Sequence, residues 1–350
     1  MSSTLALVMI VKDEAASLER CLASAIGAVD ETIVLDTGST DATVDIARRM
    51  GATVHHFAWC DDFSAARNAA LDFSNANWNL ILDADEWIVS GQDELRKLKA
   101  GDFIGQIAVA SLFDNTGTES MSTEWISRLL PRGVRYTGRI HEQPSHPILP
   151  RRRIGLHVRH DGYLPYLLAA KQGRNQSLLK KALERTPADA YLLYQLGKDS
   201  AVYGQYNDAV GYFLKALALS SNLDSYRHDL VVRSLFALKK ANMHERAIEL
   251  ASNELEHWQH SPDYFFCVAD IFLEWAAIHP GEAETELLPI VESALLKCLG
   301  IGDQPMISGS VAGRGSYLAA HNLAVLYENT GRARDAAYYT ALAVDMKKHQ

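Results

Sequence analysis

The sequence predicts an α/β domain built on a mostly parallel sheet, followed by an all-α domain of helical repeats. Short apolar runs alternate with helical patterns through residues 1–100. From about residue 173 the pattern is almost wholly helical and contains self-similar segments. A chain of 350 residues is also too long for one ordinary core. We therefore expect two domains, residues 1–170 and residues 171–350.

The first domain begins with an aliphatic run, LALVMIV at 5–11, whose length and continuity indicate a strand buried on both faces. A helix over about 17–25 follows, because its apolar residues fall at helical spacing. Such alternation is typical of right-handed βαβ units in a parallel sheet. Residues 104–165 are more strand-like and richer in loops. Between these parts, strands are expected at 32–36, 52–57 and 78–85 and helices at 41–50 and 64–73.

The second domain repeats one pattern in two well-separated segments, 191–217 and 317–344. Each has a small residue after a leucine, Gly197 or Ala324, and alanines further along. This spacing resembles that of tetratricopeptide repeats, in which small residues let paired helices approach and aromatic residues fill the groove. The segments between them look like divergent copies. Such repeats could hold a polypeptide in a concave groove, mediate a homodimer or orient a glycan acceptor, and the sequence leaves these roles open.

Charge and cysteine content exclude several classes of protein. The formal net charge of −9 argues against a nucleic-acid binder, which would carry a basic surplus. The four cysteines are widely spaced and form no CxxC pair, which indicates buried thiols in a reducing compartment. No run approaches the roughly 18 uncharged apolar residues that span a bilayer, and no basic residues precede the first apolar run. We expect a cytoplasmic protein without a transmembrane segment.

Acidic residues stand where the predicted parallel strands end, the edge at which open α/β sheets bind ligands. The first strand lacks a glycine-rich turn after it, which argues against a dehydrogenase or a nucleotidyltransferase. Asp36 ends the second strand, where its carboxylate can accept hydrogen bonds from a nucleoside base or ribose. For Asp41, which follows shortly after, capping of the next helix is an equal alternative.

The fourth strand ends in the acidic sequence DADE, at residues 83–86. In an extended backbone Asp83 and Asp85 point to the same side, so their carboxylates repel one another. A divalent cation relieves that repulsion, and hard oxygen ligands suit Mn²⁺ or Mg²⁺. Such a cation would bridge the phosphates of a nucleotide diphosphate and stabilise the departing charge. The pattern therefore predicts a metal-dependent nucleotide site at this strand end.

Three stretches carry a resemblance to a known family: LVMIVKDEAASLERCLAS, DETIVLDTGSTDATVDIARRMGATVHHFAWCDDFSAARNAAL and WNLILDADE, in this order. They resemble the nucleotide-binding half of family-2 glycosyltransferases with the A-type fold, closely over about residues 4–90. Together with the repeats, they make the chain similar to bacterial family-2 enzymes that carry helical repeats. The resemblance implies an inverting glycosyltransferase that uses a UDP-sugar as its donor.

The resemblance also implies roles for single residues. Asp13 stands where the family most often has asparagine. His160 resembles the later histidine that completes the metal site in many A-type enzymes, and His157 is an equally placed rival. Carried over position by position, the resemblance implies that Asp13, Glu14 and Asp36 contact the nucleoside, that Arg67 and Asn68 lie beside the diphosphate, that Asp83 touches the ribose or the metal, and that Asp85 coordinates the metal.

An arginine-rich segment follows in the second half of this domain. Between Arg128 and Arg159 the sequence has eight arginines, no lysine and one acid, Glu142. Guanidinium groups match phosphate oxygens bidentately, so we expect Arg128 and Arg132 to serve the donor site. For the three arginines at 151–153, exposed solubilising charge is an equally good interpretation.

Glu142 is the predicted general base. An inverting transfer needs a carboxylate on the acceptor side to take the proton of the attacking hydroxyl or thiol. Asp83 and Asp85 are committed to the donor side, and nearby arginines would keep Glu142 ionised. The sequence GRIHEQ, at 138–143, also resembles the segment that holds the catalytic acid in this family. Asp114 remains a rival for the base, and a salt bridge from Glu142 to one of those arginines is the structural alternative.

These observations predict a metal-dependent inverting glycosyltransferase that moves a sugar from a UDP-sugar to a polypeptide or glycan acceptor. The alternative is a non-catalytic interaction protein, in which a relic nucleotide-binding domain is attached to the repeats. The sequence leaves open which sugar is transferred, and whether it goes to oxygen, sulfur or nitrogen.

Overall fold

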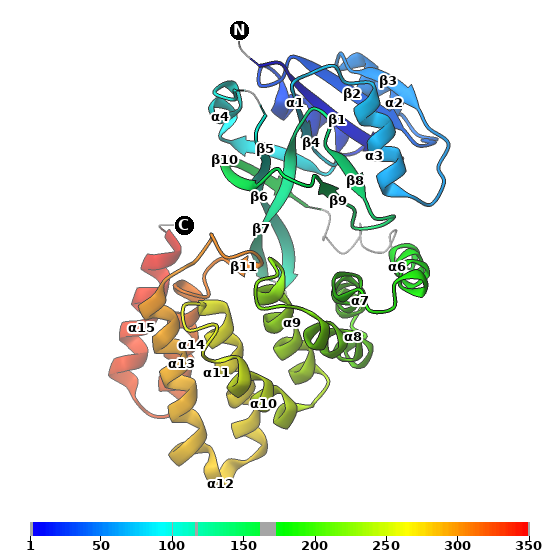
Figure 1. Cartoon of the computed structure of the whole chain (residues 1–350). Coiled ribbons are helices and arrows are strands. Elements are labelled where there is room, and N and C mark those ends of the chain that lie inside the picture. Colours follow the sequence, from blue (N-terminus) through cyan, green and yellow to red (C-terminus); the bar gives the residue numbers. More distant parts are fainter. Residues whose placement is uncertain (1–2, 100, 116–117, 162–172, 349–350) are drawn as a thin grey trace. The chain divides into compact units, whose positions relative to one another are not determined.

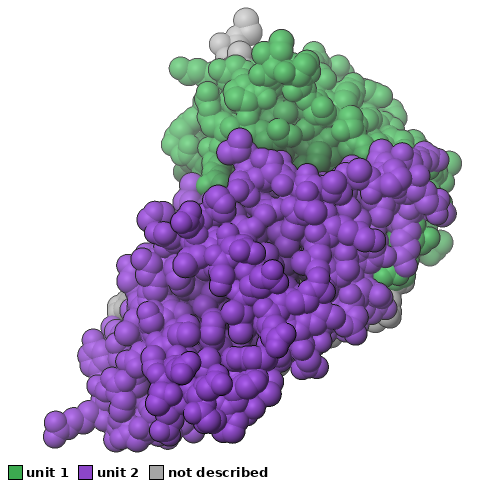
Figure 2. Space-filling model, turned by 60° about the horizontal axis from the view of Figure 1, so that its bottom comes forward, with its two compact units in different colours: residues 1–178 green, residues 179–350 purple. Residues whose placement is uncertain are grey.

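A computed structural model describes residues 3–99, 101–115, 118–161 and 173–348. The chain divides into two compact units, Met1–Leu178 and Leu179–Gln350, which Figure 2 colours separately. The boundary that the sequence predicts, between residues 170 and 171, lies outside the described residues. Each unit has hydrophobic clusters of its own, as expected of two domains.

The first unit is built on one large sheet with the strand order β3-β2-β1-β4-β7-β6-β10-β5 (Figure 1). The half formed by β3, β2, β1 and β4 is parallel, as the sequence predicts. In the other half, β7 runs antiparallel to β4 and β6, and β5 runs antiparallel to β10. The sheet is therefore mixed, with the predicted βαβ units confined to its parallel half. The strands are β1 Leu5–Val11, β2 Glu31–Asp36, β3 Thr53–His56, β4 Trp78–Ile81, β5 Glu86–Ser90, β6 Ile104–Asn115, β7 Thr118–Pro131 and β10 Arg151–His160.

Helices cover both faces of the parallel half, and β1 shows why. Successive side chains of a strand point to opposite faces. Leu7 and Met9 pack in one cluster with α1 and α2, whereas Ala6 and Val8 pack in another with α3. The first strand is thus buried on both faces, as predicted from its continuous apolar run. The helices of this unit are α1 Leu18–Ala25, α2 Thr43–Arg49, α3 Phe63–Asp72 and α4 Gln92–Arg96.

The parallel register brings the carboxyl ends of three strands to one edge. Val11 at the end of β1 pairs with Asp36 at the end of β2, and β4 lies on the other side of β1. A small antiparallel hairpin, β8 Arg135–Thr137 and β9 Gln143–Ser145, packs against α3. The loop of this hairpin carries Glu142.

The second unit is helical, and its successive helices pack in pairs. Gly197 of α7 shows how close one pair lies. A Cβ atom there would come within 2.3 Å of the Phe213 ring of α8, so glycine permits the approach that the repeat pattern predicts. The helices are α6 Arg174–Arg185, α7 Ala190–Val202, α8 Tyr206–Leu219, α9 Arg227–Lys240, α10 His244–Glu254, α11 Pro262–Ile278, α12 Pro280–Glu282, the π-helical turn η1 Ala283–Leu287, α13 Leu288–Ile301, α14 Tyr317–Asn329 and α15 Ala333–Lys348.

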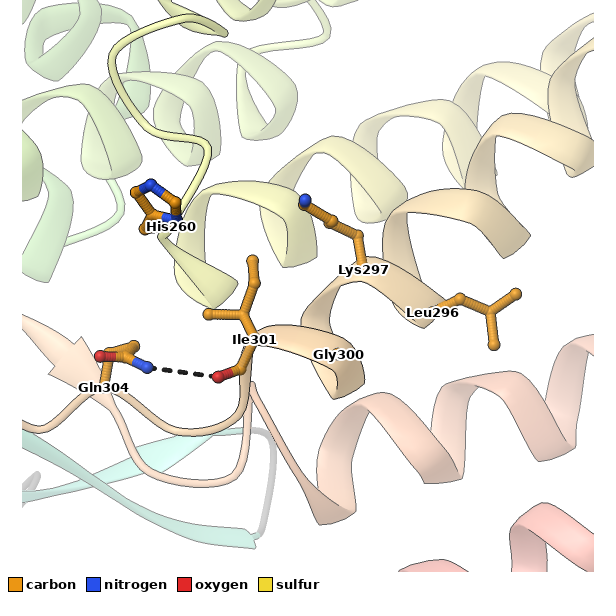
Figure 3. Close-up of a pocket in the computed structure, with 6 residues that line it drawn as sticks. All are labelled: His260, Leu296, Lys297, Gly300, Ile301 and Gln304. Atoms are coloured by element: carbon orange, nitrogen blue, oxygen red, sulfur yellow. Dashed lines mark hydrogen bonds between the residues drawn. The ribbon is translucent and has the colours of Figure 1, made fainter.

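A surface hollow of about 610 Å³ lies at the end of α13 (Figure 3). Gln304 donates a hydrogen bond from its Nε2 to the carbonyl of Ile301 at the rim, 3.2 Å away. Of the described residues, those that line this hollow include no carboxylate, so it lacks the ligands expected of a cation site. Its lining residues are His260, Leu296, Lys297, Gly300, Ile301 and Gln304. Among the helices of the described residues, none is both long and apolar enough to cross a membrane.

Candidate active site

The acidic sequence after β4 forms a closed turn. The backbone N–H of Glu86 donates to the carbonyl of Asp83 at 3.0 Å, and the Glu86 carboxylate accepts from the backbone N–H of Asp83 at 2.8 Å. The strand expected over 78–85 consequently ends at Ile81. Local side-chain hydrogen bonds of this kind compete with extended backbone. The extended arrangement predicted for Asp83 and Asp85 is therefore wrong, and their carboxylates have different partners.

Asp83 lies between two arginines. Its carboxylate accepts from Arg67 Nη2 at 2.8 Å and from Arg128 Nη2 at 2.5 Å, and Arg128 also reaches Glu86 at 3.0 Å. The side chain of Asp83 is 36% exposed, whereas those of Arg67 and Arg128 are only 7% and 11% exposed. Burial alone would raise the pKa of Asp83, but Arg128 and Arg67 hold it well below its ordinary range. Asp83 is thus the exposed, ionised end of a buried charge network.

Arg67 joins this network to Glu142. Its Nη2 holds Asp83 while its Nε donates to Glu142 Oε1, so one planar guanidinium spans both carboxylates. Gly138 and His141, in the loop before Glu142, both have positive φ, which makes the hairpin loop tight. The ion pair that the sequence left as the alternative for Glu142 is present. Its partner is Arg67 on α3 rather than an arginine of 128–159.

Asp85 faces His160 on the other side of the turn. The Oδ2 atom of Asp85 lies 3.4 Å from Nε2 of His160, and Ser111 Oγ lies 3.1 Å from the other ring nitrogen. Burial would lower the pKa of His160, but its hydrogen bond to Asp85 and the charges of the acidic turn raise it. His157 is exposed, three residues earlier on β10.

The pair of Asp85 and His160 fits a divalent cation. It offers a carboxylate oxygen and an imidazole nitrogen, and Ser111 orients the ring as outer partners of metal-bound histidines do. Asp83 is held by arginines instead. Within the described part of the chain, no three His, Cys, Asp or Glu side chains are grouped as metal ligands. Phosphate oxygens and water would complete the coordination, as Mg²⁺ prefers.

The residues expected at the nucleoside lie along the ends of β1 and β2. The buried carboxylate of Asp36 accepts from the backbone N–H groups of Gly38 and Ser39, at 3.2 and 3.0 Å. Burial would raise its pKa, but these hydrogen bonds and that of His56 lower it. Asp13 has a φ of 54° and accepts from the backbone N–H of Thr40 at 2.7 Å. Among residues other than glycine, asparagine and aspartate are two of those that tolerate this conformation best.

Glu14 and Asp41 hold the same two turns together. Glu14 accepts from the hydroxyl of Ser17 at 2.8 Å, and its backbone N–H donates to Thr43 Oγ1 at 2.7 Å. Asp41 accepts from the backbone N–H groups of Ala15 and Thr43. Asp41 is not the N-cap residue of α2, which is Ala42, but it binds the first N–H of that helix and also bridges to the first strand end.

Sequence reasoning missed or misjudged several residues of the site. Glu86 entered only as a third repelling acid, although it closes the turn and holds Arg128. Asn68, expected beside the diphosphate, has both polar atoms of its amide on the backbone of Tyr136. Arg132, expected at the donor site, donates to the carbonyl of Asn75 on the surface. In the run at 151–153, the guanidinium groups of Arg152 and Arg153 lie over the rings of Phe103 and Trp125.

The mixed sheet with its acidic strand edge, followed by a unit of paired helices, is the arrangement expected of a glycosyltransferase domain followed by a helical repeat domain. Residues 6–154 match the family model described as glycosyl transferase family 2. The first unit is therefore a family-2 glycosyltransferase domain, and the chain continues into tetratricopeptide-like repeats.

Similar proteins include both kinds of domain in their descriptions. The chain is 39% identical over 206 residues to "TPR repeat-containing protein Synpcc7942_0270" of Synechococcus elongatus, covering 55% of this chain and 51% of that protein. It is 27% identical over 264 residues to "SPbeta prophage-derived glycosyltransferase SunS" of Bacillus subtilis, covering 71% of this chain and 62% of that protein. The chain thus spans only about half to three-fifths of these relatives. The solved structure "Crystal structure of MamA" is 18% identical, covers 54% of this chain and 95% of its own, and has a TM-score of 0.40.

Proposed function

We propose that this chain transfers a sugar from a UDP-linked donor to an acceptor, with inversion at the anomeric carbon and with the help of a divalent cation. The observation that carries the proposal is the bridge from Asp83 through Arg67 to Glu142, beside the pair of Asp85 and His160. A donor-side acid, a candidate base and a candidate cation site meet at one strand edge of a family-2 domain.

On the donor side, the nucleoside would lie against Asp13, Glu14 and Asp36. Arg67 and Arg128 would face the diphosphate, because their guanidinium groups already converge on an anion, the carboxylate of Asp83. Asp85 and His160 would hold Mn²⁺ or Mg²⁺. When bound, the cation would neutralise charge that develops on the departing diphosphate.

On the acceptor side, Glu142 would act as general base. The acceptor oxygen or sulfur attacks the anomeric carbon, the bond from that carbon to the phosphate oxygen breaks, and UDP leaves with the electron pair. The acceptor proton goes to Glu142 in the same step, since a single displacement forms no covalent enzyme intermediate. Arg67 binds Glu142 through Oε1, so Oε2 is the oxygen that would take the proton.

The acceptor is proposed to be a polypeptide or a glycan presented with the help of the repeats. Solenoids of paired helices use their extended inner surface for such contacts. A homodimer through the repeats remains part of the proposal. No nucleic-acid partner is proposed.

A thermal-shift experiment with UDP tests the donor site. We expect UDP with Mn²⁺ to raise the melting temperature, and UDP without the cation to raise it less, because a ligand that binds only the folded state stabilises it. No shift under either condition would instead favour the non-catalytic interaction protein. Nucleotide release from a panel of UDP- and GDP-sugars would then identify the donor.

A further inference from the structure

Asn68 holds both backbone groups of Tyr136. Its Nδ2 donates to the Tyr136 carbonyl at 3.0 Å, and its Oδ1 accepts from the Tyr136 N–H at 2.8 Å. Asn68 lies on α3 directly after Arg67, and Tyr136 is the middle residue of β8. Only a side chain with a donor and an acceptor side by side can satisfy both groups. Asn68 therefore fixes the register of β8 against α3.

Helix α3 also binds the β8–β9 hairpin at two further points. At its first turn, the N–H of Phe63 donates to the carbonyl of Arg139 at 2.8 Å, and Arg139 pairs with Asp62 at 3.3 Å. Beside Asn68, Arg67 binds Glu142. Helix α3 and its N-cap residue Asp62 thus hold the hairpin at the middle of β8, at Arg139 in the loop and at Glu142, the last residue of the loop.

The two hydrogen bonds between Asn68 and Tyr136, which we call the Asn68 clamp, matter because the loop of the hairpin is short. Five residues, 138–142, separate β8 from β9, and Gly138 and His141 hold positive φ angles within them. A displacement of Tyr136 would therefore pass along this loop to Glu142. The side-chain amide of Asn68 binds Tyr136 and not the carboxylates of Asp83, Glu86 or Glu142.

We propose that Asn68 is a positioning residue, which sets the place of Glu142 through the β8–β9 hairpin and does not contact the donor. This inference rests on the proposed function. It departs from the role beside the diphosphate that the family resemblance implies, because both sides of the amide are engaged by Tyr136.

Two matched variants test the proposal. Asn68→Ala removes the clamp, and Asn77→Ala removes a similar one, since Asn77 Oδ1 accepts from both N and Oγ1 of Thr4 at 3.0 Å, at the opposite strand edge. The measurements are UDP affinity with Mn²⁺ by calorimetry, and kcat and KM for UDP release from the UDP-sugar that the panel selects. We expect Asn68→Ala to lower kcat by roughly tenfold to a hundredfold, the usual effect of a small misplacement. UDP affinity should stay within about twofold, and Asn77→Ala should change neither quantity.

A double variant separates positioning from a general loss of stability. If Asn68 acts through Glu142, adding Asn68→Ala to Glu142→Gln should lower kcat by less than about twofold further. Full additivity of the two effects would overturn the proposal. If Asn68→Ala does not fold, Asn68→Asp keeps the size and the acceptor but not the donor, and the same comparisons apply to it.

The remaining outcomes are distinct. A fall in UDP affinity of tenfold or more for Asn68→Ala would show a donor contact and overturn the inference. An unchanged kcat in an Asn68→Ala variant that binds UDP normally would overturn this inference but not the proposed function. A wild-type protein that neither binds UDP nor releases it from any donor would overturn the proposed function, and this inference with it.

Discussion

Two acids that look alike in the sequence have different partners in the fold. Asp83 receives two guanidinium groups, whereas Asp85, two residues later, faces an imidazole. The closed turn at 83–86 separates them, because Glu86 binds the backbone of Asp83. The protein thus compensates the charge of Asp83 itself, and Asp85 is the acid that we propose as a cation ligand.

Removal of the Asp85 charge should remove the effect of the cation on nucleotide binding. In the wild type we expect UDP to bind more tightly with Mn²⁺ than without it, because the ion would bridge Asp85, His160 and the phosphates. Asp85→Asn should bind UDP equally with and without Mn²⁺, as measured by calorimetry. Asp45→Asn, an exposed change on α2, serves as the control and should behave like the wild type. Equal affinities in the wild type would contradict the metal assignment.

Neutralising Glu142 should affect the transfer step rather than the donor. Glu142→Gln keeps the side-chain shape, so UDP-sugar binding should change by less than about threefold, while transfer falls by roughly 10²–10⁴, the usual contribution of a general base. The rate of transfer and the equilibrium binding of the UDP-sugar measure these two quantities. Asp114→Asn is the comparison, since Asp114 lies on β6 and was the rival base. Normal transfer by Glu142→Gln and slow transfer by Asp114→Asn would reverse the assignment, and unfolding of Glu142→Gln would leave Glu142 a structural ion pair.

The sequence could place the acids but not their pairing. Asp36 and the acidic turn follow apolar runs directly, so local pattern is enough to put them at strand ends. The pair of Arg67 and Glu142 joins positions 75 residues apart, and Asn68 meets Tyr136 across 68 residues. Such contacts depend on how the β8–β9 hairpin docks on α3, which no periodicity encodes.

At the scale of elements, periodicity predicted the helices and strands whose role is packing. The expected helix at 17–25 appears as α1, and Leu18, Cys21, Leu22 and Ala25 are all buried. The expected strand at 78–85 ends early, because two hydrogen bonds between Asp83 and Glu86 close a turn where the hydrophobic pattern alone would continue the strand. The hydrophobic pattern likewise could not predict the antiparallel half of the sheet, because the order in which strands pair depends on long-range contacts.

Two glycines in one helix pair should respond oppositely to alanine. Gly197→Ala puts a methyl group 2.3 Å from the Phe213 ring, so the helices must separate, at a cost of about 1–3 kcal/mol in the free energy of unfolding. Gly211→Ala, on α8, meets no atom within 4 Å and should stabilise by about 0.5–1 kcal/mol through helix propensity. Urea denaturation measures both. A neutral Gly197→Ala would mean that close packing of α7 on α8 does not matter for stability.

On the scale of the whole molecule, we expect the first unit to bind the donor and the repeat unit to present the acceptor. Every proposed donor contact lies before Leu178, where the first unit ends. A protein shortened to residues 1–178 should therefore keep slow hydrolysis of the donor and lose transfer to the natural acceptor. Released UDP and labelled acceptor give the two rates. Equal transfer by the shortened and full-length proteins would show that the repeats do not present the acceptor.

The last helix gives the repeat unit a weak end. None of the residues of α15 is buried, whereas α9, within the stack, buries residues along its whole length, including Leu230, Leu235 and Leu238. In a stack where each repeat contacts only its neighbours, unfolding begins at an end, and α15 packs chiefly on one neighbour, α14. Unfolding by heat or denaturant, and cleavage by a protease, should therefore begin at the carboxyl end and proceed toward the earlier helices. Deuterium exchange should label α15 well before α9, and simultaneous labelling of both would show that the repeats melt as one block.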